Sequence, residues 1–173
     1  MLLADSEIFQ RLNDFEHVAR ISVRLFVATV LGGLIGIERQ YEHKAAGLRT
    51  HMLVALGAAL FTIVPLEFKM ASGDVSRVMQ GITAGIGFLG AGMIFRGTDQ
   101  KDVKGLTTAA GIWVTAALGV AAGAGLLWLA IIAVLMAWFI LLVLHQIESW
   151  YKHFQKNHDA NQLADKPSSA TGS

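Results

Sequence analysis

A glycine-rich segment near the middle of the chain has the spacing of a nucleotide-binding loop. Gly85, Gly87 and Gly90 form the pattern G-x-G-x-x-G, which in dinucleotide-binding folds follows a buried strand and holds a pyrophosphate at a helix N-terminus. Here a polar loop at residues 72–77 precedes the motif, and residues 78–95 form one apolar segment of membrane length. Because the setting of a pyrophosphate site is missing, we expect neither a nucleotide nor any other cofactor.

Charged and hydroxyl side chains at the ends of apolar segments form a second group that could do chemistry. We expect them to converge on one side of a membrane as a cytoplasmic polar ring: Glu38, Arg39, Arg49, Thr50, His51, Arg96, Lys104, Thr107 and Thr108. One interpretation is that they are interface anchors and ion pairs between loops. The other is a vestibule that binds an anion or a lipid phosphate through the guanidinium groups of Arg49 and Arg96.

Metal and catalytic chemistry have little support in the sequence. A magnesium site usually needs one or two carboxylates, and no Asp or Glu lies inside an apolar segment. The chain has no cysteine, and its histidines form no H-x-x-x-H pair, which disfavours zinc. His51 is either an ordinary interfacial histidine or a pH sensor. We predict no metal site, and no hydrolase-like pattern of Ser, His and Asp indicates an enzyme.

The composition indicates lipid as the solvent of the protein. Hydrophobic residues make up 54% of the chain and charged residues 16%, with a mean hydropathy of +0.51. Soluble domains have about 45–50% apolar and about 25% charged residues. The net charge of +1 gives no global basic field, so we expect no nucleic-acid partner.

The elements that would position these residues are apolar segments separated by short polar intervals. The first three cover residues 21–37, 52–66 and 78–95, and residues 105–144 contain no Asp, Glu, Lys or Arg. A helix of that last length would be about 60 Å long, twice the roughly 30 Å hydrocarbon core, so it must fold back. Glycines at 119–125 mark the turn, with helices near 106–122 and 125–145. The predicted fold is an all-α integral membrane bundle of five transmembrane helices.

Three regions follow from this pattern. Residues 1–20 are predicted to form an amphipathic extracytoplasmic helix, residues 21–145 the five-helix transmembrane domain, and residues 146–173 a short cytoplasmic tail that is mostly disordered. Nine Lys and Arg residues fall on the side of the C-terminus and five on the other. The positive-inside rule therefore places the N-terminus outside and the C-terminus in the cytoplasm.

Small residues in the apolar segments predict close helix packing. In a bilayer, glycines let helix backbones approach each other, and the candidates are Gly32, Gly36, Gly81, Gly85, Gly87, Gly90 and Gly92. We expect the first and third segments to pack at the centre of the bundle, and the chain to form a homo-oligomer such as a dimer. Thr29, Thr62, Thr83 and Thr115 are expected to donate hydrogen bonds to carbonyls of their own helices.

Four motifs in order resemble the MgtC/SapB family of bacterial membrane proteins. They are GGLIGIERQ (32–40), AGLRTHMLVALGAALFT (46–62), GIGFLGAG (85–92) and GLTTAAGIWVTAALGVAAGAG (105–125). The resemblance covers about residues 22–145. It implies a bacterial inner-membrane protein of magnesium and acid-stress homeostasis that regulates other membrane proteins, such as ion pumps or ATP synthase, by direct contact. The alternative is a transporter or channel for Mg²⁺ or another ion.

Three departures from the virulence-type members of this family stand out. This chain has Thr107 where those members have Asn, and Val114 where they have Cys. It also has only a short tail where they carry an ACT-like domain. The chain therefore resembles the shorter, SapB-like branch.

Overall fold

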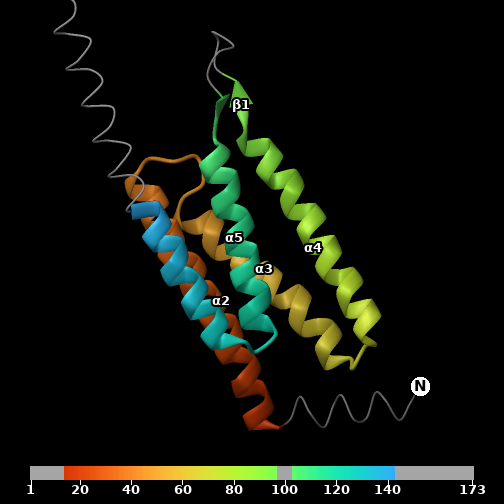
Figure 1. The fold of residues 1–173 in the computed structure, drawn as a ribbon. Coiled ribbons are helices and arrows are strands. Elements are labelled where there is room, and N and C mark those ends of the chain that lie inside the picture. The colour runs from red at the N-terminus through yellow and green to blue at the C-terminus, as the bar shows by residue number, and fades with distance from the viewer. Residues whose placement is uncertain (1–13, 97–102, 143–173) are drawn as a thin grey trace, which may run out of the picture. The chain divides into compact units, whose positions relative to one another are not determined.

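The structure, a computed structural model, describes residues 14–96 and 103–142 (Figure 1). Its helices are α2 (Phe15–Tyr41), α3 (Leu48–Glu67), α4 (Ser72–Met93) and α5 (Leu106–Gly123), followed by an unlabelled helix at Leu127–Leu142. Strands β1 (Phe95–Arg96) and β2 (Val103–Lys104) pair antiparallel. The predicted tail at 146–173 and the first thirteen residues of the predicted N-terminal segment lie outside the described residues.

The chain divides into two compact units, residues 1–135 and 136–173. The second unit is described only over residues 136–142, which are helical. The packing reported below belongs to the first unit.

Helix α2 begins earlier than the apolar segment inside it. Asp14 caps its N-terminus by accepting a 3.2 Å hydrogen bond from the backbone N–H of Glu16, as short polar side chains do at helix starts. Glu16 in the first turn and Arg39 in the last turn both complement the helix dipole. Residues 15–20, which the sequence suggested were part of a surface helix, are therefore the first turns of the 27-residue α2.

The predicted all-α membrane bundle is confirmed. Helices α2, α3 and α5 are each long and apolar enough to cross a membrane. Helix α4 has 22 residues but begins with a polar turn, and Leu127–Leu142 is a shorter apolar helix. The two-residue strands form only a small hairpin between α4 and α5.

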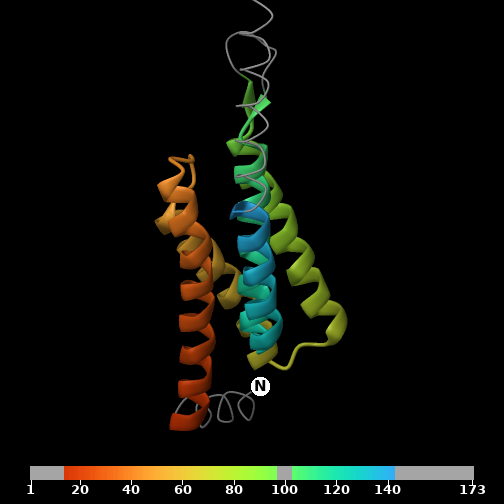
Figure 2. The same ribbon diagram turned by 60° about the vertical axis from the view of Figure 1, so that its left-hand side comes forward.

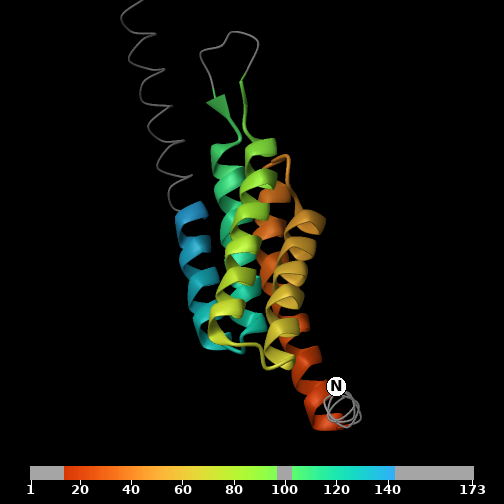
Figure 3. The same ribbon diagram turned by 90° about the vertical axis from the view of Figure 1, so that its right-hand side faces the viewer.

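Three helices form the centre of the first unit and α4 lies at its edge. Helices α2, α3 and α5 pack on one another, whereas α4 packs mainly on α5 and less on α3 (Figure 2). Consecutive helices run antiparallel, so the loop at residues 42–47 and the β1–β2 strands lie at the same end, here called the hairpin end (Figure 3).

Backbone contact between α3 and α5 is made possible by glycine. A Cβ atom on Gly119 would lie 2.2 Å from the carbonyl oxygen of Ala55, and one on Gly123 would lie 2.7 Å from that of Ala59. Around these contacts the core consists largely of buried alanines, including Ala55, Ala59, Ala116 and Ala122. The small residues therefore set the distance between these two helices, as expected for membrane helices.

The predicted packing glycines fall into two groups. Gly32 and Gly36 of α2 lie against α3, where added Cβ atoms would come within 2.6 Å of the His51 carbonyl oxygen and 2.7 Å of the Leu48 Cα. On α4, Gly81, Gly85, Gly87 and Gly92 have nothing within 4 Å of the Cβ position, and Gly90 has only ordinary contact with Ala109, at 3.7 Å.

The expectation that the third segment packs at the centre of the bundle is therefore corrected within a single chain. Among the described residues of α4, Gly90 alone is buried. The reason is physical: small-residue spacing identifies a helix surface that allows close approach, but it does not say which helix approaches.

Glycine at positive φ shapes both ends of α5. Gly105 precedes the helix at φ +93°, where a Cβ atom would lie 1.9 Å from the Met93 carbonyl oxygen. Gly125 follows it at φ +83°, a conformation that favours glycine. The predicted fold-back is present, but the turn is confined to Ala124 and Gly125, while Gly119 and Gly123 lie inside α5.

The predicted threonine hydrogen bonds are confirmed. The hydroxyls donate to the carbonyl four residues earlier at 2.8–2.9 Å, the donor–acceptor pairs being Thr29–Leu25, Thr62–Ala58, Thr83–Met79 and Thr115–Gly111. The hydroxyl of Thr115 also contacts His51, as described next.

Candidate functional site

The structure separates the predicted polar ring into buried and exposed members. Glu38 and Arg39 of α2, His51 of α3 and Thr108 of α5 are buried. Arg49, Lys104 and Thr107 are exposed and Thr50 is half-buried. Arg96 belongs to β1, but its side chain lies outside what the structure describes.

His51 makes the main polar contact between α3 and α5. Its Nδ1 lies 2.7 Å from the hydroxyl oxygen of Thr115, and that hydroxyl donates to the Gly111 carbonyl at 2.8 Å. A threonine hydroxyl has one proton to donate. Because that proton goes to Gly111, the ring must donate through Nδ1–H, and the hydrogen bonds assign this tautomer.

The second ring nitrogen of His51 is open. The side chain is fully buried, and Nε2 has no hydrogen-bond partner among the described residues. In the assigned tautomer Nε2 carries a lone pair, so it can accept a proton or a donor group. A buried polar atom without a partner is uncommon in native proteins, which marks this ring as a candidate functional group.

Glu38 and Arg39 form a buried ion pair between neighbouring residues of α2. Arg39 donates from Nε to one carboxylate oxygen and from Nη2 to the other. Opposite charges that are paired and hydrogen-bonded can be buried together, whereas removing one partner leaves the other charge uncompensated. The pair stands near His51, with which both Arg39 and Glu38 interact electrostatically.

Sequence reasoning missed Thr115 as a partner of His51. The predicted polar ring included Thr107 and Thr108 at the start of α5, but His51 contacts Thr115, about two turns further along. A signal was present, because small or hydroxyl residues recur three or four positions apart on α5 and define one face. These residues are Thr108, Gly111, Thr115, Gly119 and Gly123.

Arg24 is a second contact that the sequence did not identify. Its Nη1 donates to the Gly123 carbonyl at 3.4 Å, and its guanidinium lies 3.0 Å from where a Cβ on Gly125 would be. A cation at the C-terminus of a helix interacts favourably with the helix dipole. Arg24 therefore joins α2 to the end of α5, opposite the hairpin end.

The described residues offer hydrogen bonding and charge rather than a metal cage. Residues 14–96 and 103–142 contain no group of three His, Cys, Asp or Glu side chains that could hold a metal ion. What the buried residues provide is a hydrogen bond between α3 and α5, one open imidazole nitrogen and an ion pair within α2.

Comparison with known proteins identifies the family. Residues 25–150 match the MgtC family. The chain is 43% identical over 150 residues to the protein SrpB of Synechococcus elongatus, covering 79% of this chain and 77% of that protein. It is 40% identical over 147 residues to YhiD of Escherichia coli K12, named as a candidate magnesium transporter, and 50% identical over 115 residues to the protein MgtC of Brucella abortus. No solved structure matches this chain.

The matched region is shorter than two of these relatives. It covers 81% of this chain and 66% of the E. coli protein, and 65% of this chain and 46% of the Brucella protein. The family match nevertheless includes the whole of α3, α4 and α5 and most of α2. The chain belongs to the MgtC family.

Proposed function

We propose that this protein is a regulator in magnesium and acid-stress homeostasis that acts by direct contact with other membrane proteins. The observation that carries the proposal is an unoccupied face of α4, here called the outer face and formed by Ala84, Gly87 and Ala91. These residues are exposed, and their spacing of three and four places them on one side of the helix. A Cβ on Gly87 would meet nothing within 4 Å.

A face of this kind suits another membrane helix. Contacts between helices in lipid are enriched in small residues, because small residues allow backbones to approach and pack closely. The same chain uses this device between α3 and α5, at Gly119 and Gly123. We propose that the outer face receives a helix of a partner such as an ion pump or ATP synthase, or of a second copy in a dimer.

The second candidate function is transport of Mg²⁺ or another ion. It is favoured by the name of the E. coli relative, a candidate magnesium transporter. Against it stands the close packing of α3 on α5, together with the lack of a three-ligand cluster among the described residues. A hydrated Mg²⁺ ion needs oxygen ligands and space for several waters.

We also propose where the protein lies, how it is oriented in the membrane and that it is not an enzyme. The distribution of Lys and Arg supports a bacterial inner-membrane protein with its N-terminus outside, its C-terminus in the cytoplasm and its hairpin end on the cytoplasmic side. The absence of a recognisable catalytic arrangement in the sequence supports a protein that is not an enzyme.

Photo-crosslinking in native membranes tests the contact. A photoreactive amino acid replaces Gly87, and a matched control replaces Phe26, an exposed α2 residue. We expect a discrete protein adduct from position 87 and none from position 26. Gly87→Leu should also abolish complementation of a deletion strain under magnesium limitation or acid, whereas Gly73→Leu, at an equally open position in the first turn of α4, should complement. Full complementation by Gly87→Leu, with no adduct at 87, would overturn the proposal.

A further inference from the structure

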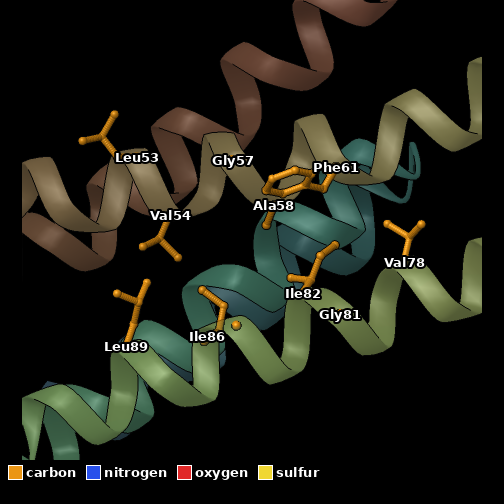
Figure 4. Close-up of a pocket in the computed structure, with 11 residues that line it drawn as sticks. Leu53, Val54, Gly57, Ala58, Phe61, Val78, Gly81, Ile82, Ile86 and Leu89 are labelled. Carbon is orange, nitrogen blue, oxygen red and sulfur yellow. The ribbon is translucent and has the colours of Figure 1, made fainter.

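A lateral groove between α3 and α4 lies on a different side of α4 from the outer face. It has a volume of about 660 Å³. Val54 of α3 faces Ile86 and Leu89 of α4 across it (Figure 4). Leu53, Gly81 and Gly85 also belong to the lining. All of the groove's lining residues are apolar or glycine.

Glycine residues on both walls keep this groove open. Gly57 on one wall and Gly81 and Gly85 on the other have nothing within 4 Å of their Cβ positions. Larger residues there would fit the backbone and fill the groove. Water is a poor occupant, because a bound water needs two to four polar partners. In a bilayer the neighbouring material is lipid.

The groove is long and apolar along its whole length. Its α4 lining runs from Val78 to Leu89, which is about 16 Å along a helix axis. An extended groove with only apolar and glycine walls suits a flexible apolar chain.

Positive charge lies at the hairpin end of the groove. Thr50 precedes Leu53 and Val54 by one helical turn and so continues the groove face, with Arg49 beside it. Arg49 is exposed and forms no hydrogen bond or ion pair with any other described residue. From Arg49 to Phe61, the far end of the α3 lining, is about 18 Å along the helix. The hydrocarbon of one leaflet is about 15 Å thick.

We propose that this groove binds one acyl chain of an anionic phospholipid whose phosphate is held by Arg49. The chain lies between α3 and α4 against Gly57, Gly81 and Gly85, and the guanidinium group donates to the phosphate oxygens. The proposal does not depend on the partner contact at the outer face of α4, because the two faces use different residues.

Native mass spectrometry of the purified full-length protein with added phosphatidylglycerol tests this site. We expect the wild type to retain one phosphatidylglycerol molecule, in preference to phosphatidylcholine. The Gly85→Leu variant should no longer retain the lipid molecule. Gly57→Leu fills the groove from its α3 wall and should have the same effect. The matched control is Gly73→Leu, the same substitution on the same helix at an equally open position outside the groove. Arg49→Gln should weaken binding about fivefold, whereas Arg77→Gln, an exposed arginine near the start of α4, should not.

Several results would overturn the proposal. Equal retention of the lipid by all folded variants would do so, and so would displacement of phosphatidylglycerol by millimolar inorganic phosphate, which would show a site for free phosphate. A loss of binding in Arg49→Gln without any loss in Gly85→Leu and Gly57→Leu would exclude the acyl chain from the groove. Loss of a dimer instead of lipid in those two glycine variants would show that a second copy occupies it.

Discussion

The imidazole Nδ1 of His51 and the hydroxyl of Thr115 lie 2.7 Å apart and join the first turn of α3 to the middle of α5. Both side chains are fully buried. The bond fixes the lengthwise position of the two helices, because sliding either by one turn would separate the pair by about 5.4 Å. It also directs the open Nε2 into the packed interior of the bundle.

Replacing Thr115 should destabilise the protein more than its volume change suggests. Thr115→Val keeps the shape of the side chain but leaves His51 Nδ1 without an acceptor, so we expect a loss of about 1 kcal/mol in unfolding free energy. Thr115→Ser should restore much of the loss, because it keeps the hydroxyl. Reversible unfolding in mixed micelles provides the measurement.

Thr83→Val is the control for this experiment. Thr83 makes the same bond to its own helix, to Met79 at 2.9 Å, but is exposed and contacts no buried histidine. An equal effect of Thr115→Val and Thr83→Val would show that the contact with His51 contributes nothing to stability.

A single added methyl group at Gly119 should separate α3 from α5. Its Cβ would lie 2.2 Å from the Ala55 carbonyl oxygen and 2.9 Å from the Ala58 Cβ. Since the first of these is backbone, no side-chain rotation relieves the clash, and we expect Gly119→Ala to cost about 1–3 kcal/mol of unfolding free energy. The thermal midpoint in detergent should fall accordingly.

Gly87→Ala is the matched variant for Gly119. Alanine is the better helix former, and the position is open, so this substitution should leave the midpoint unchanged or raise it. A midpoint that falls as far for Gly87→Ala as for Gly119→Ala would contradict the packing described for α3 and α5.

Arg24 should stabilise the end of α5 through charge as well as hydrogen bonding. Arg24→Gln removes the cation beside the Gly123 carbonyl, and we expect a loss of about 1 kcal/mol. Hydrogen exchange should show faster exchange at the amides of Ala124, Gly125 and Leu126, which are hydrogen-bonded to carbonyls of the last turns of α5. Unchanged exchange at these three amides would argue against this role for Arg24.

Much of the fold could be predicted from the sequence because apolar length and glycine position are local properties. The uncharged stretch 105–144 required a fold-back, and the turn lies at Ala124 and Gly125. The start of α2 was harder to predict, since the polar residues Glu16, His17 and Arg20 indicated a separate surface helix and yet belong to α2. There the cap at Asp14, and a 2.7 Å contact of His17 with Glu67 at the end of α3, hold the extra turns.

The candidate site was predicted less completely because it depends on how the helices slide past one another. Sequence position placed His51 level with Thr108, both near the start of a helix. Packing of Gly32 and Gly36 on α3, and of Gly119 on Ala55, instead sets His51 opposite Thr115. Glycine spacing likewise identified α4 as a close-packing surface without showing that its glycines are open in a single chain.

Mg²⁺ flux into proteoliposomes distinguishes regulation by contact from transport. The purified wild type is compared with empty vesicles and with the Arg49→Ala and Glu38→Ala variants, each verified as folded. We expect Mg²⁺ entry into wild-type vesicles to be no faster than into empty ones. Saturable entry through the wild type that either variant removes would contradict it and would make the polar residues of the hairpin end part of a transport path.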